Sequence, residues 1–482
     1  MTNNPHFKKI LLTLRENCPT ENMDEIRRAY EFASAAYGEK RRASGKLQIE
    51  HALEVAELLA SWKLSPDIVV AGLLHDILEN SPYNEDDIRK KFGQKIARLI
   101  VGENRLDSLK YWGKERYAEN LRRMFMAMAE DVQIIFIKFA DRIDNLKTLS
   151  YLLPEKQKRL ATESLHIYAP IANRLGMDKI KRDLEDLAFS YIDPKEYEKI
   201  SEFVANYYHD DGKCMKTVDT ALRDSARASG IRIINIDNRI KSLYSLFEKI
   251  NLRQREKKNV YDIAACRIIV PTISDCYAMI GIIHRFWKPL PGRFKDYISQ
   301  PKPNGYRSLH TNVFCEKKVV EFQVRTPEMH EEAEFGIAAH WVYKEKEKNI
   351  GENIKRRTAW LKELAEIQKE LKNNYTLPKT IQSVKIDLFK NRIFTFTPKG
   401  DVIELPEDAT PLDFAYSIHA HLGNYYAKAR INGKIIPIGY ALKSNDVVEI
   451  VKSEKPTAKK SWLKIAKTRR ARNEIRDYLR MK

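Results

Sequence analysis

The stretch PDIVVAGLLHDILEN (66–80) places an apolar segment directly before a His-Asp pair. Pro66 is typical of a helix start, and the apolar residues after it predict a buried helix that leads to His75. The preceding stretch QIEHALEVAELLASW (48–62) repeats apolar residues at helical spacing and carries His51. Strand signals are scarce before residue 200, so we expect an all-α region there.

The length, composition and charge of the chain limit the classes of protein to which it can belong. The chain has 482 residues, which at about 150 residues per domain suggests three domains. Hydrophobic residues make up 43% of it, which excludes a largely disordered chain. The 85 Lys and Arg exceed the 66 Asp and Glu by 19, and this surplus favours polyanionic partners such as nucleotides, nucleic acid or acidic lipid.

The cysteines and the apolar segments point to the cytoplasm. None of the five cysteines forms a C-x-x-C pair, so zinc fingers and a disulfide framework are not expected. No apolar stretch approaches the roughly 18 residues of a membrane span, and the first apolar run is too short for a signal peptide. We therefore expect a cytoplasmic protein without a membrane partner.

After about residue 215 the pattern changes to strands that alternate with helices. Apolar β-rich runs lie at 231–236, 264–270, 311–315 and 319–324, and helical patterns lie at 239–250 and 276–287. This order predicts an α/β or α+β domain with a mixed sheet. The Pro-rich loop at 288–306 is long for a compact domain, and such loops are usually functional.

The C-terminal part predicts a third, smaller unit. Short strand patterns at 384–389, 392–397 and 401–405 indicate a β-grasp-like module, and residues 452–482 carry 12 Lys and Arg against 3 Asp and Glu. The expected domains are 1–155, a helical connector at 156–200, 201–345, a helical linker at 346–383, 384–452, and a basic helical tail at 453–482.

His51, the pair His75-Asp76, and Asp141 are candidate ligands of a divalent metal in the helical region. Imidazole and carboxylate together suit manganese, iron or zinc. Glu79, three residues after Asp76, could orient or deprotonate a water molecule. A single His-Asp pair more often caps a helix or faces solvent, and that alternative stays open.

The second region carries the residue types that pyrophosphate transfer needs, namely cations for the phosphates and carboxylates for Mg²⁺. Asp262 precedes the apolar run at 264–270, and Glu321 lies in the run at 319–324. The cations before them are Arg239, Lys241 and Lys249. No G-x-x-x-x-G-K-[ST] or G-x-G-x-x-G motif is present, so P-loop and protein-kinase readings have no support. Isolated basic residues are usually solvated, which is the alternative here.

Longer strings resemble the RelA/SpoT homologue family of alarmone synthetase/hydrolases. GLLHDILEN (72–80), KFADRIDNLKTL (138–149) and the stretch 153–189 resemble its hydrolase half. PLPGRFKDYISQPKPNGYRSLHT (289–311) and EFQVRTPEMHEEAEFGIAAHWVYK (321–344) resemble its synthetase half, and 391–451 resembles its TGS domain. The resemblance implies an all-α HD-type hydrolase domain, an α/β nucleotidyltransferase-like synthetase domain with a mixed sheet, and a β-grasp TGS domain. It also implies a C-terminally short member that ends after the TGS domain.

For the hydrolase, the resemblance implies that His51, His75, Asp76 and Asp141 bind Mn²⁺. The residues that would hold the nucleotide (p)ppGpp are Arg42, Asn145 and Thr148. Three short motifs depart from the family pattern. Glu-Asp reads Glu79-Asn80, Arg-Lys-Ser-Gly reads Arg42-Ala43-Ser44-Gly45, and Arg-Leu-His-Asn reads Arg142-Ile143-Asp144-Asn145. The lost carboxylate and the lost cation are expected to weaken water activation or phosphate binding.

For the synthetase, the resemblance implies that ATP donates its β,γ-pyrophosphate to the 3′-hydroxyl of GDP or GTP. Asp262 and Glu321 would hold Mg²⁺, with Glu321 as the general base. Tyr306 would stack on guanine, and Asn304 and His310 would complete the acceptor pocket. The phosphates would be neutralised by Arg239, Lys241, Lys249, Arg293, Lys295 and Lys302. The basic loop that begins with Arg293 matches family members that have both activities.

In the third unit, His419 matches the family histidine that touches the tRNA 3′ end, although a histidine in such a stretch is more often structural. A tRNA or ribosome partner is therefore one expectation. Two alternatives remain: a synthetase with a purely regulatory HD domain, and an RNA- or ribosome-binding regulatory protein. If both activities are present, they would form a futile cycle, so we expect reciprocal switching through the helices at 155–200.

Overall fold

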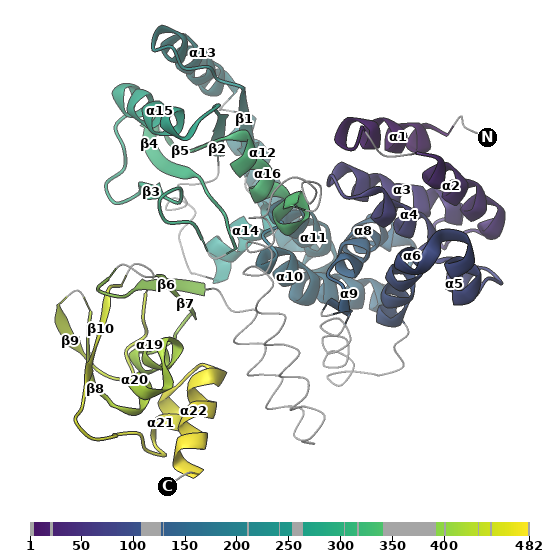
Figure 1. The fold of residues 1–482 in the computed structure, drawn as a ribbon. Helices are drawn as coiled ribbons and strands as arrows, with labels where there is room; N and C mark the ends of the chain where they lie inside the picture. The colour runs from purple at the N-terminus through teal and green to yellow at the C-terminus, as the bar shows by residue number, and fades with distance from the viewer. Residues whose placement is uncertain are drawn as a thin grey trace. The chain divides into compact units, whose positions relative to one another are not determined.

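The computed structural model divides the chain into two units, Met1–Glu366 and Ile367–Lys482, which are described separately (Figure 1). The model describes residues 4–19, 23–107, 127–128, 130–209, 212–240, 242–252, 264–302, 304–315, 318–340, 392–399, 402–431, 433–443 and 446–480. The expected helical linker at 346–383 and the strand pattern at 384–389 lie outside the described residues.

The first half of the first unit is helical, as the sequence predicts. Its elements up to the metal-ligand candidates are α1 (Pro5–Asn17), α2 (Asp24–Tyr37), α3 (Gln48–Ser61), α4 (Pro66–Leu74), α5 (Ile77–Asn80), α6 (Glu85–Asp107) and α8 (Gln133–Lys147). Pro66 starts α4, where the missing amide hydrogen costs nothing. Helix α8 is shielded from solvent at 13 of its 15 residues, so it forms the centre of this bundle together with α3, α4 and α6.

Prolines also divide the connector into short helices. Pro154 and Pro194 are the first residues of α9 (Pro154–Glu163) and α12 (Pro194–His209), and Pro170 lies in the first turn of α10 (Ala169–Arg174). A π-helical turn, Ser164–Tyr168, precedes α10. Helix α11 (Asp178–Ile192) then contacts α8, α9, α12, α14 and α16, so it joins the helical bundle to the next region.

The second half of the unit contains the expected mixed sheet, with strand order β1-β2-β5-β4-β3. Only the β2–β5 pair is parallel. The strands are β1 (Asn235–Ile240), β2 (Ala264–Ile269), β3 (Lys295–Asp296), β4 (Leu309–Cys315) and β5 (Lys318–Arg325). Helices α13 (Gly212–Ala228) and α15 (Ile273–Phe286) supply Leu222, Met279 and Ile283 to the core on one face of the sheet. Arg267 of β2 points to the other face, where it meets α16 (Pro327–Phe335).

Two boundaries predicted from the sequence are wrong in this region. The expected strand at 231–236 begins at Asn235, and the expected helix at 239–250 starts with two residues of that strand. The reason is pairing with β2, because Asn235 lies opposite Ile269 and Ile240 opposite Ala264. Helix α14 (Leu243–Phe247) begins only after Ser242, whose hydroxyl accepts a hydrogen bond from the Ser245 amide at 3.1 Å. The π-helical turn Glu248–Leu252 follows it.

The second unit contains two small sheets and short helices. The strands are β6 (Arg392–Phe396), β7 (Val402–Pro406), β8 (Tyr426–Ile431), β9 (Lys434–Ile436) and β10 (Val448–Lys452), paired as β6-β7 and β10-β8-β9. Helices α19 (Pro411–Ile418) and α20 (Ala420–Asn424) precede β8, and α21 (Trp462–Ile465) and α22 (Arg469–Arg480) follow β10. In the part of the chain that the structure describes, no helix could span a membrane.

The basic C-terminal segment packs against the rest of the second unit. Trp462 and Ile475 join the same hydrophobic core as Leu412 and Tyr426. Asp413, which has no exposed surface, fixes this arrangement. Its carboxylate caps its own helix by accepting hydrogen bonds from Thr410, and it also accepts hydrogen bonds from the amides of Lys467 and Thr468 and from the Thr468 hydroxyl. The segment is therefore part of the fold of this unit.

Replacing Asp413 with Ala should destabilise the second unit, because buried donors on both helices would lose their acceptor. We expect a loss of about 2–4 kcal/mol in the free energy of unfolding, measured by urea titration with tryptophan fluorescence. Asp477→Ala removes an exposed carboxylate from α22 and serves as the control. Equal unfolding midpoints for the two variants would contradict this role of Asp413.

Candidate metal centre and nucleotide sites

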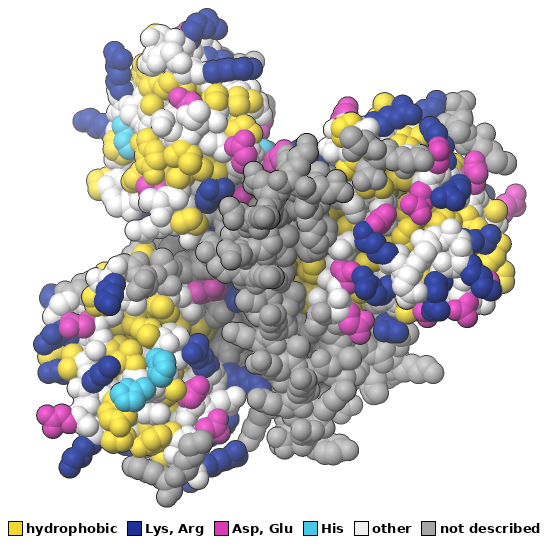
Figure 2. Space-filling view, in the orientation of Figure 1, with side chains coloured by type: hydrophobic (Ala, Val, Ile, Leu, Met, Phe, Trp, Pro, Cys, Tyr) yellow, Lys and Arg dark blue, Asp and Glu magenta, His cyan; other side chains and the backbone are white. Residues whose placement is uncertain are grey.

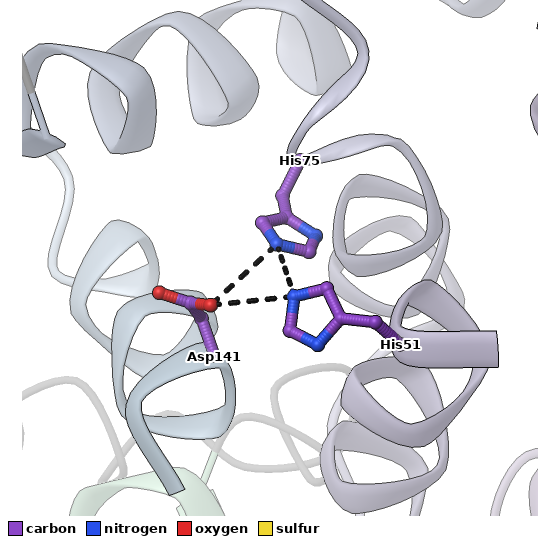
Figure 3. A group of neighbouring side chains, drawn as sticks. All are labelled: His51, His75 and Asp141. Atoms are coloured by element: carbon purple, nitrogen blue, oxygen red, sulfur yellow. Dashed lines mark hydrogen bonds and ion pairs between the residues drawn. The ribbon is translucent and has the colours of Figure 1, made fainter. Parts of the chain in front are cut away.

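Three side chains converge in the middle of the helical bundle (Figure 3). His51 comes from α3, His75 follows α4 directly, and Asp141 lies on α8. The Nε2 atoms of the two histidines are 3.2 Å apart, and Asp141 Oδ1 lies 3.4 Å from His51 Nε2 and 3.8 Å from His75 Nε2. The Asp76 carboxylate lies beside the group, 3.5 Å from His75 Nε2. The structure thus brings all four predicted metal ligands together.

Hydrogen bonds fix which nitrogen of each imidazole faces the group. His75 Nδ1 donates to the Gly72 carbonyl at 2.8 Å, and His51 Nδ1 donates to Asp144 Oδ2 at 2.7 Å. Both Nε2 atoms therefore point at each other, and two such lone pairs need a shared proton or a cation between them. This donor set of two imidazoles and carboxylates fits a first-row divalent metal.

The pKa values of His51 and Asp141 are shifted away from their usual values. Burial lowers the pKa of His51, but hydrogen bonds to the carboxylates of Asp141 and Asp144 outweigh it and raise this pKa to about 9. Burial also opposes ionisation of Asp141, yet the Lys138 ammonium and both histidines hold its pKa well below the usual range. A cavity of about 420 Å³ opens beside these residues. Asp76 and Asp141 line this cavity, whose volume lies in the range of small-molecule binding sites.

The other predicted hydrolase residues line this cavity. Arg42 donates to the Asn145 side chain, and Asn145 in turn donates to Asp141 Oδ1 at 2.6 Å. Glu79 and Thr148 also lie on its wall. Two of the departures from the family pattern, Ala43 and Asn80, line the same cavity, so a restored Lys or Asp there would meet a bound ligand.

Sequence reasoning did not assign a role to several residues of this site. Lys138 is 1% exposed, and its ammonium binds Glu103 at 3.1 Å and Asp141 Oδ2 at 2.9 Å. A lone lysine inside the apolar run IIFIKFA was a usable signal, because a lysine there must find a buried partner. Among the other cavity residues without an assigned role are the polar side chains of Gln48, Arg142, Lys156, Arg159 and Glu163.

The predicted synthetase residues form a second group on the sheet. Glu321 of β5 and His310 of β4 lie on the same face, with His310 Nδ1 donating to Glu321 Oε1 at 3.0 Å. The Tyr306 hydroxyl donates to His310 Nε2 at 2.7 Å. Burial lowers the pKa of His310, which favours the neutral ring that this chain of hydrogen bonds requires. The structure thus brings Tyr306, His310 and Glu321 together.

Tyr306 is shielded in this conformation. Tyr306 is only 8% exposed, and the Lys302 ammonium lies 4.6 Å from the centroid of its ring. Burial lowers the pKa of Lys302. Stacking of guanine on this ring would therefore require Lys302 to move away from it.

The remaining predicted residues are described unevenly. Arg293 is exposed just before β3, Lys295 is exposed at the start of β3, and Lys249 lies in the turn after α14. The Asn304 amide donates to the Asn173 carbonyl at 3.5 Å. Arg239 belongs to β1, but its side chain is outside the described part, as are Lys241 and Asp262. The expected pairing of Asp262 with Glu321 on Mg²⁺ stays a prediction.

Helix α16 and the turn between α10 and α11 connect the two groups within the first unit. The Glu334 carboxylate accepts a hydrogen bond from Arg182 of α11 at 2.6 Å and lies 3.0 Å from Arg267 of β2. The Ile337 amide donates to the Leu175 carbonyl at 3.0 Å. A Cβ on Gly336 would lie 2.2 Å from that same carbonyl oxygen, so this approach requires glycine.

Comparisons with known proteins agree with this architecture. Residues 29–178 match the HD domain family, 238–348 match the region found in RelA / SpoT proteins, and 393–452 match the TGS domain family. The bifunctional (p)ppGpp synthase/hydrolase SpoT of Escherichia coli K12 is 37% identical over 98% of this chain and 67% of its own length. The chain belongs to the RelA/SpoT family.

Other relatives have names for one activity each. A guanosine-3′,5′-bis(diphosphate) 3′-pyrophosphohydrolase of Aquifex aeolicus is 43% identical over 95% of this chain, and a GTP pyrophosphokinase of Myxococcus xanthus is 41% identical over 97%. The chain spans 65% and 62% of the length of these two relatives.

Replacing Lys138 with Met should strongly destabilise the helical bundle, because Glu103 and Asp141 would be left as buried carboxylates without their cation. Breaking a buried ion pair in this way typically costs about 3–5 kcal/mol, which urea unfolding measures directly. Adding Glu103→Gln should recover part of the loss. Lys147→Met, at an exposed position of the same helix, is the control. Unfolding of Lys138→Met at the wild-type midpoint would show that the pair is not needed.

Proposed function

We propose that this chain is a cytoplasmic enzyme that both makes and degrades guanosine tetra- and pentaphosphate in the stringent response. The synthetase would transfer the β,γ-pyrophosphate of ATP to the 3′-hydroxyl of GDP or GTP. The hydrolase would remove the 3′-pyrophosphate of the product again. The observation that carries the proposal is the presence of two separate polar groups in one chain, each built from the residues that its reaction requires.

In the proposed synthesis, the Glu321 carboxylate takes the proton of the ribose 3′-hydroxyl as the 3′-oxygen attacks the β-phosphorus of ATP and AMP leaves. The hydrogen bond from His310 orients this carboxylate, and the Tyr306 hydroxyl fixes the His310 ring. Mg²⁺ held by Asp262 and Glu321 would neutralise the phosphates together with the cations of the loop. Tyr306 would stack on guanine, and Asn304 would help to bind the acceptor.

In the proposed hydrolysis, His51, His75, Asp76 and Asp141 hold Mn²⁺. A divalent ion held by these residues would supply Lewis-acid activation of a water molecule. Glu79 is placed on the cavity wall to accept the proton of that water. Arg42, Asn145 and Thr148 bind the nucleotide, and Asn145 also holds Asp141 in place.

The second unit supports a further proposal, a contact with the tRNA 3′ end, in the context of the ribosome. The only histidines of this unit are His419 and His421, and histidine side chains lie together on its surface beside hydrophobic ones (Figure 2). His419 Nδ1 accepts a hydrogen bond from the His421 amide at 3.1 Å, and the His421 ring stacks on Tyr425 at 4.2 Å. These exposed rings could stack on unpaired bases, and the cations of α22 could meet phosphates.

Reciprocal control of the two activities is proposed to run through α11 and α16. Glu334 of α16 binds Arg182 of α11 and lies beside Arg267 of β2. A shift of α16 would therefore alter both its contact with α11 and the position of β2. Such coupling requires that each nucleotide binds one arrangement better than the other.

Glu321→Gln should abolish synthesis because it removes the proposed base while keeping the shape of the side chain. Conversion of labelled ATP and GDP in the presence of Mg²⁺ measures this activity, and hydrolysis of ppGpp with Mn²⁺ should stay unchanged. Glu328→Gln, at an exposed position of α16, should retain both activities. Normal synthesis by Glu321→Gln would exclude the assignment.

The hydrolase of the unmodified chain should be slow, because Asn80 cannot carry the charge of the family's aspartate and Ala43 gives the phosphates no cation. Asn80→Asp combined with Ala43→Lys should raise the rate of pyrophosphate release by about 10–100-fold in an assay with Mn²⁺. An equal rate in the unmodified chain would mean that both departures are neutral. Absence of hydrolysis in both proteins, despite bound metal, would favour a purely regulatory HD domain.

A further inference from the structure

Asp144 stands where the family pattern Arg-Leu-His-Asn has histidine. It lies on α8, three residues after Asp141, and its side chain is 2% exposed. Its Oδ2 atom is 2.7 Å from His51 Nδ1. An aspartate at this depth has a high desolvation cost, so it is retained only where it has a partner.

The partner is a proposed metal ligand. A carboxylate can only accept a hydrogen bond, so the proton must lie on His51 Nδ1 and the lone pair on Nε2. The Nε2 atom is the one that faces His75 and Asp141. Histidines that bind metals commonly donate their other N–H to a carboxylate, which fixes the ring and makes it a stronger ligand.

A second carboxyl group, that of Glu54, lies close to the Asp144 carboxylate. Burial together with Asp144 raises the pKa of Glu54. Lys46 binds Glu54 from the surface at 2.8 Å. Lys46, Glu54 and Asp144 therefore form a line of polar groups that begins at the surface. Of these three residues, Asp144 is the one that accepts a hydrogen bond from His51.

We propose that Asp144 is a positioning residue that holds His51 for the metal and makes this centre bind Mn²⁺ more tightly than the family's histidine at the same point would. A neutral histidine could accept the same hydrogen bond through a ring nitrogen, but it would bring no negative charge. The inference rests on the proposed hydrolase function, because it concerns the same metal.

With this role for Asp144, the affinity for the metal and the rate of hydrolysis depend on different residues of the chain. Ala43 and Asn80 remove charges from the cavity wall that would face the nucleotide, whereas Asp144 adds a charge behind the metal. The chain is thus expected to bind the ion tightly even where hydrolysis is slow.

The test is calorimetric titration of Mn²⁺ into the metal-free, full-length protein and into three variants. Asp144→Ala should weaken binding by about 10–100-fold. Asp144→Asn keeps the shape and an acceptor oxygen but not the charge, so its affinity should lie between wild type and Asp144→Ala. Asp144→His, the family residue, should also bind more weakly than wild type. Unchanged affinity in Asp144→Ala, or tighter binding in Asp144→His, would overturn the proposal.

Two controls separate positioning from a general structural role. Glu54→Gln changes the neighbouring carboxyl that does not contact His51, so its Mn²⁺ affinity should stay within about threefold of wild type, a margin well below the effect of losing a ligand-orienting partner. The thermal midpoint of each metal-free variant reports folding, and Asp144→Asn is the variant that keeps the packing if Asp144→Ala does not fold. A loss of stability without a loss of affinity in Asp144→Asn would also overturn the proposal.

The outcome also distinguishes this inference from the proposed hydrolase function. If the wild-type protein binds Mn²⁺ but does not hydrolyse ppGpp, the function fails while the order of affinities still decides the role of Asp144. If the wild-type protein binds no Mn²⁺, both fail together.

Discussion

Helix α8 carries a lysine and two aspartates through the most shielded part of the helical bundle, and each of these charges requires a partner. Lys138 is neutralised by Glu103 and Asp141, and Asp144 is hydrogen-bonded to His51. Because an unpaired buried charge costs several kcal/mol, these pairs determine how α3, α6 and α8 can pack. The same pairs leave Asp141 Oδ1 and the two Nε2 atoms directed at one point. The constraint that stabilises the bundle is thus the one that creates the candidate metal centre.

The second polar group follows a different design. Its residues lie on adjacent strands, where the β4–β5 register puts His310 opposite Gln323, two residues along β5 from Glu321 and on the same face of the sheet. The sheet fixes the base rigidly, whereas Tyr306 comes from the Pro-rich loop and is covered by Lys302. An exposed cavity at one centre and a covered ring at the other are the arrangement expected if the two activities are not used together.

Close contacts near Glu334 and Gly336 join the connector helices to the sheet. Glu334 is shared by an arginine of the connector and an arginine of the sheet, and backbone atoms near Gly336 lie against the turn after α10. Tightly packed interfaces change between discrete arrangements because they have no room for gradual deformation. This part of the fold is therefore where the proposed coupling between the two sites would act.

The sequence by itself determined the class of each region and most of the residues of the two sites. Helical periodicity, prolines at helix starts and β-rich runs act locally, so they predicted the helical bundle and the mixed sheet correctly. The four proposed metal ligands and the group of Tyr306, His310 and Glu321 were predicted from their motifs, and the structure brings each group together. Only the tertiary structure decided the start of β1, the burial of Tyr306 and the partners of Lys138, Asp144 and Asp413. These features depend on residues far apart in the chain, such as Glu103 with Lys138 or Asp413 with Thr468. The energy of burying a charge or pairing a strand is set by those distant neighbours, and local sequence does not contain them.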